Sequence, residues 1–232
     1  LRIERSASDN TVAAYATDLS DFAAFLDALG VDDATKVTRD DVIGYEADLR
    51  DRGYAPSSID RRISALKGLY RFCVREGYFI KNPTESVKLP KPAEKLPDVL
   101  SIAKMNALLD GLPHDTPTDL RNRAILEVLY GCGLRVSECT GLDLSSCLLD
   151  QGILRIKGKG GKERVSPISG SAANALADYL EIGRPQLVKS YAKPTSAVFL
   201  NARGGRFTRQ SVHTLVENAG VSVGVNNLHP HT

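Results

Sequence analysis

Apolar residues in the first ninety positions recur every three or four residues, which is the spacing of an amphipathic α-helix. The pattern predicts one helix that follows Asp9-Asn10-Thr11 and ends at Gly30, and a second from near Thr38 to before Gly53. A third helix is predicted from position 56 to 77. Its apolar stripe steps by four, three, four and three residues: Ile59, Ile63, Leu66, Tyr70 and Cys73.

The second half of the chain mixes helical and strand patterns. Helices are predicted at 101–109, 119–130, 171–182 and 208–217. Between them, the segments 152–156 and 163–168 read as strands on either side of a glycine-rich turn, KGKGGK at 157–162, which predicts a hairpin. The expected fold class is therefore mainly α with a small antiparallel β-sheet.

A proline-rich segment separates these two halves. KLPKPAEKLP, at 88–97, interleaves three prolines with lysines. Proline fixes φ and removes a backbone donor, so this stretch is expected to be an extended linker. The predicted organisation is a helical domain at 1–88, a linker at 89–97 and a second domain at 98–232.

The formal net charge of +2 is unevenly distributed. Residues 1–56 carry six Lys/Arg and twelve Asp/Glu, whereas 57–95 carry nine and four, and 152–209 carry eleven and three. Two basic segments suggest a polyanionic partner such as a nucleic acid, and the alternative is that these cations serve only solubility. No apolar run is long enough for a membrane span.

The four cysteines do not form a Cys-x-x-Cys pair and have no histidine at ligand spacing. We therefore expect free thiols in a reducing cytoplasm and no metal site. The chain begins with Leu1 rather than Met, so the numbering is expected to start inside a longer protein.

Three groups of residues are candidates for chemistry or binding. In the third helix, Arg61, Lys67, Arg71 and Arg75 share a broad face opposite the apolar stripe, with Arg62 near its edge. This face can lie against phosphates or simply be solvated. In GCGLRVSE, Arg135 follows a two-glycine bend, and Glu138 can pair with it or fix its rotamer. The alternative for Arg135 is an ordinary residue at a helix start.

The glycine-rich turn is the third candidate. It is not a P-loop, because strands flank it on both sides and no Gly-Lys-Ser/Thr follows four spacer residues. Its lysines, Lys157, Lys159 and Lys162, can approach a phosphate or a leaving oxygen, and lysine can act as a general acid when neighbours lower its pKa. The alternative is a solvated hairpin tip.

Taken together, these segments resemble the tyrosine recombinase (phage integrase) family, most closely its XerC/XerD-like branch. The resemblance covers essentially the whole chain and is carried by GLRVSE, KGKGGKERVSPI, TRQSV and LHPHT. It implies a SAM-like, helical core-binding domain followed by a catalytic domain. By position in these motifs, Arg135 matches the first catalytic arginine, Lys159 the catalytic lysine and His231 the histidine of a His-x-x-Arg motif.

The resemblance also implies that the catalytic set is incomplete within these 232 residues. The arginine partner of His231 would stand two positions after Thr232, and the family's later histidine and tyrosine nucleophile follow it. Tyr179 and Tyr191 precede this motif, so we expect both to be packing residues. The parent protein is expected to be an enzyme, and this chain as given is expected to be inactive.

The activity that the resemblance implies is site-specific recombination. A tyrosine attacks a DNA phosphodiester to give a 3′-phosphotyrosyl link and a free 5′-hydroxyl, and a partner strand reverses the step without a cofactor. The implied partners are double-stranded DNA, clamped between the two domains, and a homo- or hetero-tetramer of recombinases on two duplexes, in the cytoplasm. The biological role, chromosome dimer resolution or integration and excision of a mobile element, stays open.

The implied DNA-contacting residues come from both halves of the chain. A helix that opens at Thr208-Arg209-Gln210 is expected to enter the major groove, with a cap and phosphate contacts as the alternative. Competing interpretations of the whole chain are a DNA-binding fragment without catalysis and a type IB topoisomerase, against which the short first domain argues. The full predicted contact set is Arg61, Arg62, Lys67, Arg71, Arg75, Lys88, Lys91, Lys157, Lys162, Arg164, Thr208, Arg209 and Gln210.

Overall fold

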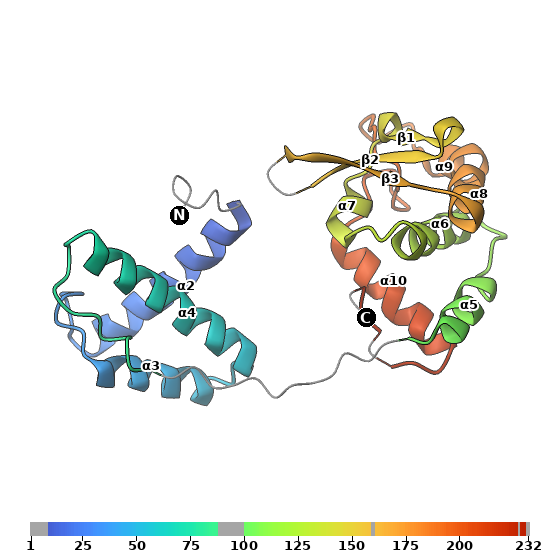
Figure 1. Ribbon diagram of the computed structural model, residues 1–232. Coiled ribbons are helices and arrows are strands. Elements are labelled where there is room, and N and C mark those ends of the chain that lie inside the picture. The colour runs from blue at the N-terminus through green and yellow to red at the C-terminus, as the bar shows by residue number, and fades with distance from the viewer. Residues whose placement is uncertain (1–8, 88–99, 159–160, 227, 231–232) are drawn as a thin grey trace. The chain divides into compact units, whose positions relative to one another are not determined.

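The computed structural model describes residues 9–87, 100–158, 161–226 and 228–230 (Figure 1). The chain divides into two units, Leu1–Lys95 and Leu96–Thr232. The predicted linker at 89–97 lies outside the described residues, so its extended conformation stays a prediction.

The described residues of the first unit form three helices: α2 (Asp9–Ala28), α3 (Arg39–Asp51) and α4 (Pro56–Arg75). Their positions confirm the three helices predicted from the apolar spacing. Thr38 caps α3 through a reciprocal capping box, in which its hydroxyl accepts from the Asp41 backbone N–H and the Asp41 carboxylate accepts from the Thr38 backbone N–H. Such a box satisfies backbone donors that a helix start leaves unpaired.

The core of the first unit lies where α2, α3 and α4 meet. The apolar stripe predicted on α4 is buried throughout, and Phe22 of α2 and Tyr45 of α3 pack edge to face at 5.0 Å between ring centroids. The stripe therefore places the opposite side of α4, which carries the predicted basic face, toward solvent.

The second unit is helical around a small sheet. Its regular elements, in chain order, are α5 (Ile102–Asp110), α6 (Pro117–Gly131), α7 (Val136–Thr140), β1 (Cys147–Leu148), β2 (Ile153–Lys157), β3 (Glu163–Pro167), α8 (Gly170–Asp178), a π-helical turn (Tyr179–Gly183), α9 (Arg184–Leu187) and α10 (Arg209–Ser222). None of the helices in the described part of the chain is long and apolar enough to cross a membrane.

Among the described residues, three strands form one antiparallel sheet in the order β1-β2-β3. The predicted hairpin is confirmed: Ile153 pairs with Pro167 and Lys157 with Glu163. Leu154 and Ile156 face inward and are buried, whereas Arg155 and Lys157 face outward. Strand β1 was not predicted, because two residues are too short to show an alternating pattern.

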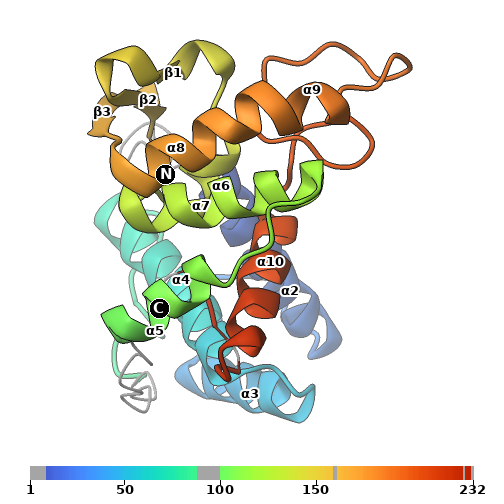
Figure 2. The same cartoon turned by 90° about the vertical axis from the view of Figure 1, so that its right-hand side faces the viewer.

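The core of this unit is formed by α6, the inner face of the sheet, α8 and α10. Figures 1 and 2 show α5 and α10 on the side of α6 away from the sheet. Tyr179 is buried and donates to the Val198 carbonyl at 3.1 Å, which confirms it as a packing residue. The same prediction for Tyr191 is wrong, because Tyr191 is 78% exposed. Aromatic residues in loops need not reach the core, so the presence of a tyrosine at this position does not imply burial.

Candidate active site and nucleic-acid interface

Arg135 lies at a tight bend between α6 and α7. The bend uses Gly133 at a φ of 59°, a conformation that favours glycine. Leu134 and Val136, on either side of Arg135, are both buried and anchor the backbone. The Arg135 side chain itself is 72% exposed. A fixed backbone therefore presents an exposed guanidinium, as the sequence suggested.

Glu138 holds Arg135 from inside the protein. Its Oε1 accepts from Arg135 Nη1 at 3.0 Å, and its Oε2 accepts from the Arg135 backbone N–H at 2.9 Å. The pairing of Glu138 with Arg135, which the sequence suggested, is thus present. The Glu138 side chain is only 4% exposed. Burial alone would raise the pKa of Glu138, but the hydrogen bonds from Arg135 and Arg164 outweigh it and lower the pKa, so the carboxylate is charged.

The β2–β3 hairpin reaches the same carboxylate. Arg164 of β3 donates from Nη2 to Glu138 Oε2 at 2.9 Å. A Cβ placed on Gly158 would lie 4.0 Å from Glu138 Oε1, so the start of the glycine-rich turn is close to Arg135. Lys162 closes the turn, because its carbonyl accepts from the Gly158 N–H at 2.8 Å. The structure therefore brings this turn and Arg135, distant in sequence, into one region.

The start of α10 is exposed beside α7. Thr208 caps the helix by accepting from the Ser211 N–H at 3.1 Å, and Arg209 and Gln210 are exposed in its first turn. Arg206, just before the cap, donates to the carbonyls of Thr140 and Leu142 at 2.9 and 3.0 Å. These bonds tie the start of α10 to the end of the helix that Arg135 begins. Sequence reasoning missed this tie, because a single Arg before a helix cap carries no readable signal.

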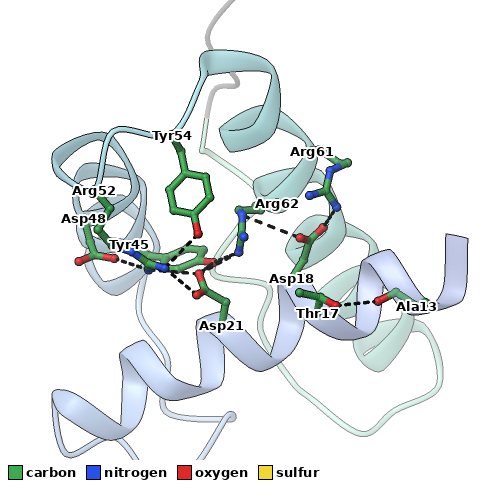
Figure 3. Close-up of polar contacts among 10 residues, drawn as sticks. All are labelled: Ala13, Thr17, Asp18, Asp21, Tyr45, Asp48, Arg52, Tyr54, Arg61 and Arg62. Carbon is green, nitrogen blue, oxygen red and sulfur yellow. Dashed lines mark hydrogen bonds and ion pairs between the residues drawn. The ribbon is translucent and has the colours of Figure 1, made fainter. Parts of the chain in front are cut away.

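Arg62 is an internal residue, and its assignment as a DNA contact is corrected here. Its side chain is 8% exposed and donates to Asp21 Oδ2 at 2.8 Å. It lies 3.8 Å from Asp18, whose side chain is fully buried, and over the Tyr54 ring at 4.5 Å. Figure 3 shows Asp18 and Asp21 of α2 pointing at the Arg62 guanidinium. A guanidinium enclosed by carboxylates and an aromatic ring is not accessible to a phosphate.

Two other cations of α4 are also paired within the first unit. Arg61 is 45% exposed and forms an ion pair with Asp18. Arg75 pairs with Glu76 at 2.8 Å and lies over the Phe72 ring at 5.4 Å. The excess of acid in 1–56 and of base in 57–95 therefore partly cancels inside the unit, because acidic side chains of α2 meet basic side chains of α4.

The remaining cations of α4 border an open groove with a volume of about 600 Å³. Lys67 donates to the Val87 carbonyl, and Arg71 is exposed. Lys81 joins them at the groove, together with polar Asn82 and Thr84. Lys81 was missed as a site residue, since only its contribution to the net charge of 57–95 was visible in the sequence.

Four predicted site residues lie outside the described residues: Lys88, Lys91, Lys159 and His231. The cysteines are free; Cys73 and Cys139 are buried, and Cys132 and Cys147 are half-buried. Burial raises the pKa of the Cys147 thiol to about 11, so this thiol stays protonated at neutral pH.

Each of the two units matches the profile of a known protein family. The phage integrase family profile matches residues 98–232, and the profile of the phage integrase N-terminal SAM-like domain matches residues 1–77. The chain belongs to the phage integrase family. Within this family it lies in the XerC/XerD-like branch of the tyrosine recombinases, as its sequence relatives indicate.

This integrase-family chain is 40% identical over 229 residues to tyrosine recombinase XerC of Roseiflexus castenholzii, covering 98% of this chain and 73% of the relative. It is 39% identical over 233 residues to tyrosine recombinase XerD of Pseudomonas aeruginosa, covering 100% of this chain and 77% of the relative. The predicted family is therefore confirmed.

Solved structures show the same fold. XerH site-specific recombinase bound to palindromic difH substrate matches with a TM-score of 0.75 at 20% identity, covering 98% of this chain and 67% of that one. The Tn1549 transposon integrase in complex with circular intermediate DNA matches with a TM-score of 0.74 at 18% identity, covering 99% of this chain and 80% of that one. The predicted fold class, mainly helical with a small antiparallel sheet, is thus confirmed.

Proposed function

We propose that this protein is a site-specific recombinase that cleaves and rejoins DNA strands through a 3′-phosphotyrosyl intermediate. The observation that carries the proposal is Arg135, an exposed guanidinium held from within by buried Glu138 and adjacent to the glycine-rich turn. The sequence relatives support it, since XerC and XerD are named tyrosine recombinases.

Arg135 is suited to a scissile phosphate because of its remaining donors. A guanidinium has five N–H donors in a planar fork, and only Nη1 of Arg135 is engaged by Glu138. The others can bind non-bridging phosphate oxygens in pairs. When a tyrosine oxygen attacks phosphorus, negative charge grows on these oxygens, and a donor already in position stabilises it.

We assign to Lys159 the proton that the leaving 5′ oxygen requires. As the P–O bond to the 5′ oxygen breaks, Lys159 would donate a proton to give the 5′-hydroxyl, and His231 would hydrogen-bond the phosphate or assist proton transfer. These two roles rest on the family motifs. Gly158, which precedes Lys159 in the glycine-rich turn, is close to Glu138, and this proximity supports the assignment.

We infer a revised DNA-contacting set from the contacts within each unit. In the first unit we retain Lys67 and Arg71 and add Lys81, because they border one groove. Arg61 and Arg75 have internal partners, so we expect them to contribute less to DNA binding. In the second unit we retain Lys157, Lys162 and the start of α10. Lys88 and Lys91 stay proposals, as do a tetramer on two duplexes and a cytoplasmic location.

The proposal is tested with the complete gene product and a nicked suicide duplex, whose site is first enriched from a random-sequence pool by binding. The complete gene product is expected to form a covalent adduct that survives denaturation. The polypeptide of residues 1–232 is expected to bind the same duplex without forming an adduct. Its affinity should fall steeply with salt, because neutralised phosphates release counterions.

Two results would contradict these expectations. An adduct formed by residues 1–232 would mean that a tyrosine within them acts as the nucleophile. A complete gene product that binds the duplex and never forms an adduct would establish the competing interpretation, a DNA-binding protein without catalysis.

A further inference from the structure

Strand β3 donates hydrogen bonds on both sides of the bend that carries Arg135. Ser166 donates from its hydroxyl to the Cys132 carbonyl at 3.1 Å, just before the bend. Arg164 donates to Glu138 at 2.9 Å, just after it. These residues are two apart on one strand and so lie on the same face. Arg164 pairs across the sheet with Ile156, which is buried, so this face is the inner one.

Arg164 and Arg135 share the Glu138 carboxylate in an unequal way. Oε2 accepts from the Arg135 backbone N–H and from Arg164, each at 2.9 Å, whereas among the described residues Oε1 accepts only from Arg135 Nη1, at 3.0 Å. The Arg135 side chain therefore uses a single donor toward Glu138. The second oxygen, which a bidentate Arg–carboxylate pair would need, is already occupied.

We propose that Arg164 is a positioning residue for strand cleavage, which acts through Glu138 to keep the Arg135 guanidinium free for the scissile phosphate. This inference rests on the proposed recombinase function. Without Arg164, the buried carboxylate has one free acceptor site and less compensating charge. Arg135 would then turn its fork onto Glu138, because a buried charge is stabilised by closing on its remaining partner. The donors that the phosphate needs would be lost.

The competing role for Arg164 is a direct phosphate contact, which the sequence alone suggested and which its 42% side-chain exposure permits. The two roles differ in what they change. A phosphate contact contributes to DNA affinity and to its salt dependence. A residue that acts through Glu138 changes the cleavage rate, and its effect disappears once Glu138 is neutral.

A double-mutant cycle in the complete gene product separates them. The variants are Arg164→Met, Glu138→Gln and the double variant, measured for single-turnover cleavage of the suicide duplex and for DNA affinity at several salt concentrations. Arg164→Met is expected to slow cleavage by up to roughly a hundredfold, the scale for a misplaced reacting group. The double variant is expected to cleave no more slowly than the slower single variant, since the two act as one unit.

The matched control is Arg155→Met, which removes the same charge from the neighbouring strand on the outer face of the hairpin. It is expected to cleave like the wild type. If Arg164→Met folds poorly because Glu138 is left uncompensated, the double variant relieves that charge, and its rate relative to Glu138→Gln still tests the inference. Arg164→Lys, which restores a cation, is expected to recover part of the rate.

The outcomes distinguish a failure of the proposed function from a failure of the positioning role of Arg164. A wild-type protein that forms no adduct contradicts the proposed function. If the wild type cleaves and the losses from Arg164→Met and Glu138→Gln multiply in the double variant, the positioning role is contradicted and the proposed function is not. Weaker binding by Arg164→Met with a salt slope lowered by about 0.9 would instead make Arg164 a phosphate contact.

Discussion

Replacing Arg62 with leucine is expected to destabilise the first unit without weakening its contacts to DNA. Arg62 donates to Asp21 at 2.8 Å and stacks over Tyr54 at 4.5 Å. It also lies 3.8 Å from Asp18, a carboxylate with no exposed side-chain surface. Leucine removes these interactions and leaves the two carboxylates with less compensating charge.

The size of the effect follows from what stays in place. Removing one member of a buried ion pair typically costs about 3–5 kcal/mol. Here Arg61 still pairs with Asp18, and Arg52 still pairs with Asp21 at 2.8 Å. The lower end of the range, about 3 kcal/mol of unfolding free energy, is therefore expected. That corresponds to roughly a hundredfold increase in the population of the unfolded unit.

Hydrogen exchange measured by mass spectrometry gives the free energy for each unit separately. A whole-chain melting curve is less suitable, since two units need not unfold in one transition. The slowest-exchanging amides of α3 and α4 are expected to exchange about a hundredfold faster in Arg62→Leu, with those of α6 and α8 unchanged. Arg71→Leu is the matched control: it is exposed at the groove, and its effect on stability should stay within about 0.5 kcal/mol.

DNA binding should show the opposite pattern. Under conditions where both variants are folded, Arg71→Leu is expected to lose affinity and Arg62→Leu is not. An Arg62→Leu protein with unchanged exchange rates, weaker binding and a smaller salt slope would contradict the internal role of Arg62. Arg62 would then contact a phosphate, as its position in the sequence first suggested.

Three further predictions concern the other sites. In the complete gene product, Arg135→Lys keeps the charge but loses the planar fork, so cleavage should fall by roughly two to three orders of magnitude with DNA affinity nearly unchanged; an equal loss of both would reduce Arg135 to an anchor. Arg209→Ala should reduce discrimination between selected and scrambled duplexes in a binding assay, and equal weakening on both would indicate a backbone contact. Hydrogen bonding from Arg52 lowers the pKa of Asp21, so the stability that Asp21 contributes is present above its unfolded pKa of about 3.9 and is lost as pH falls through its lower folded value. Asp21→Asn should therefore reduce the loss of thermal stability as the pH falls into the acid range, as measured by circular dichroism. An unchanged pH dependence would contradict this.

Local pattern was sufficient for most of the secondary structure. The stripe on α4 and the alternation in β2 each repeat over enough residues to identify the element and its buried face. The motif around Arg135 was also readable, because its bend, its buried neighbours and Glu138 lie within a few residues of each other. Strand β1 has only two residues and therefore carried no such signal.

The roles of individual cations were decided only by tertiary structure. Arg61 and Arg62 are adjacent in sequence, yet one is 45% exposed and the other 8% exposed. The difference comes from Asp18 and Asp21, which α2 places against α4 from more than forty positions away. In the same way, Arg164 meets Glu138 across 26 positions because the hairpin folds onto α7. Helical phase gives the direction of a side chain, whereas the charge it meets depends on which other element packs there.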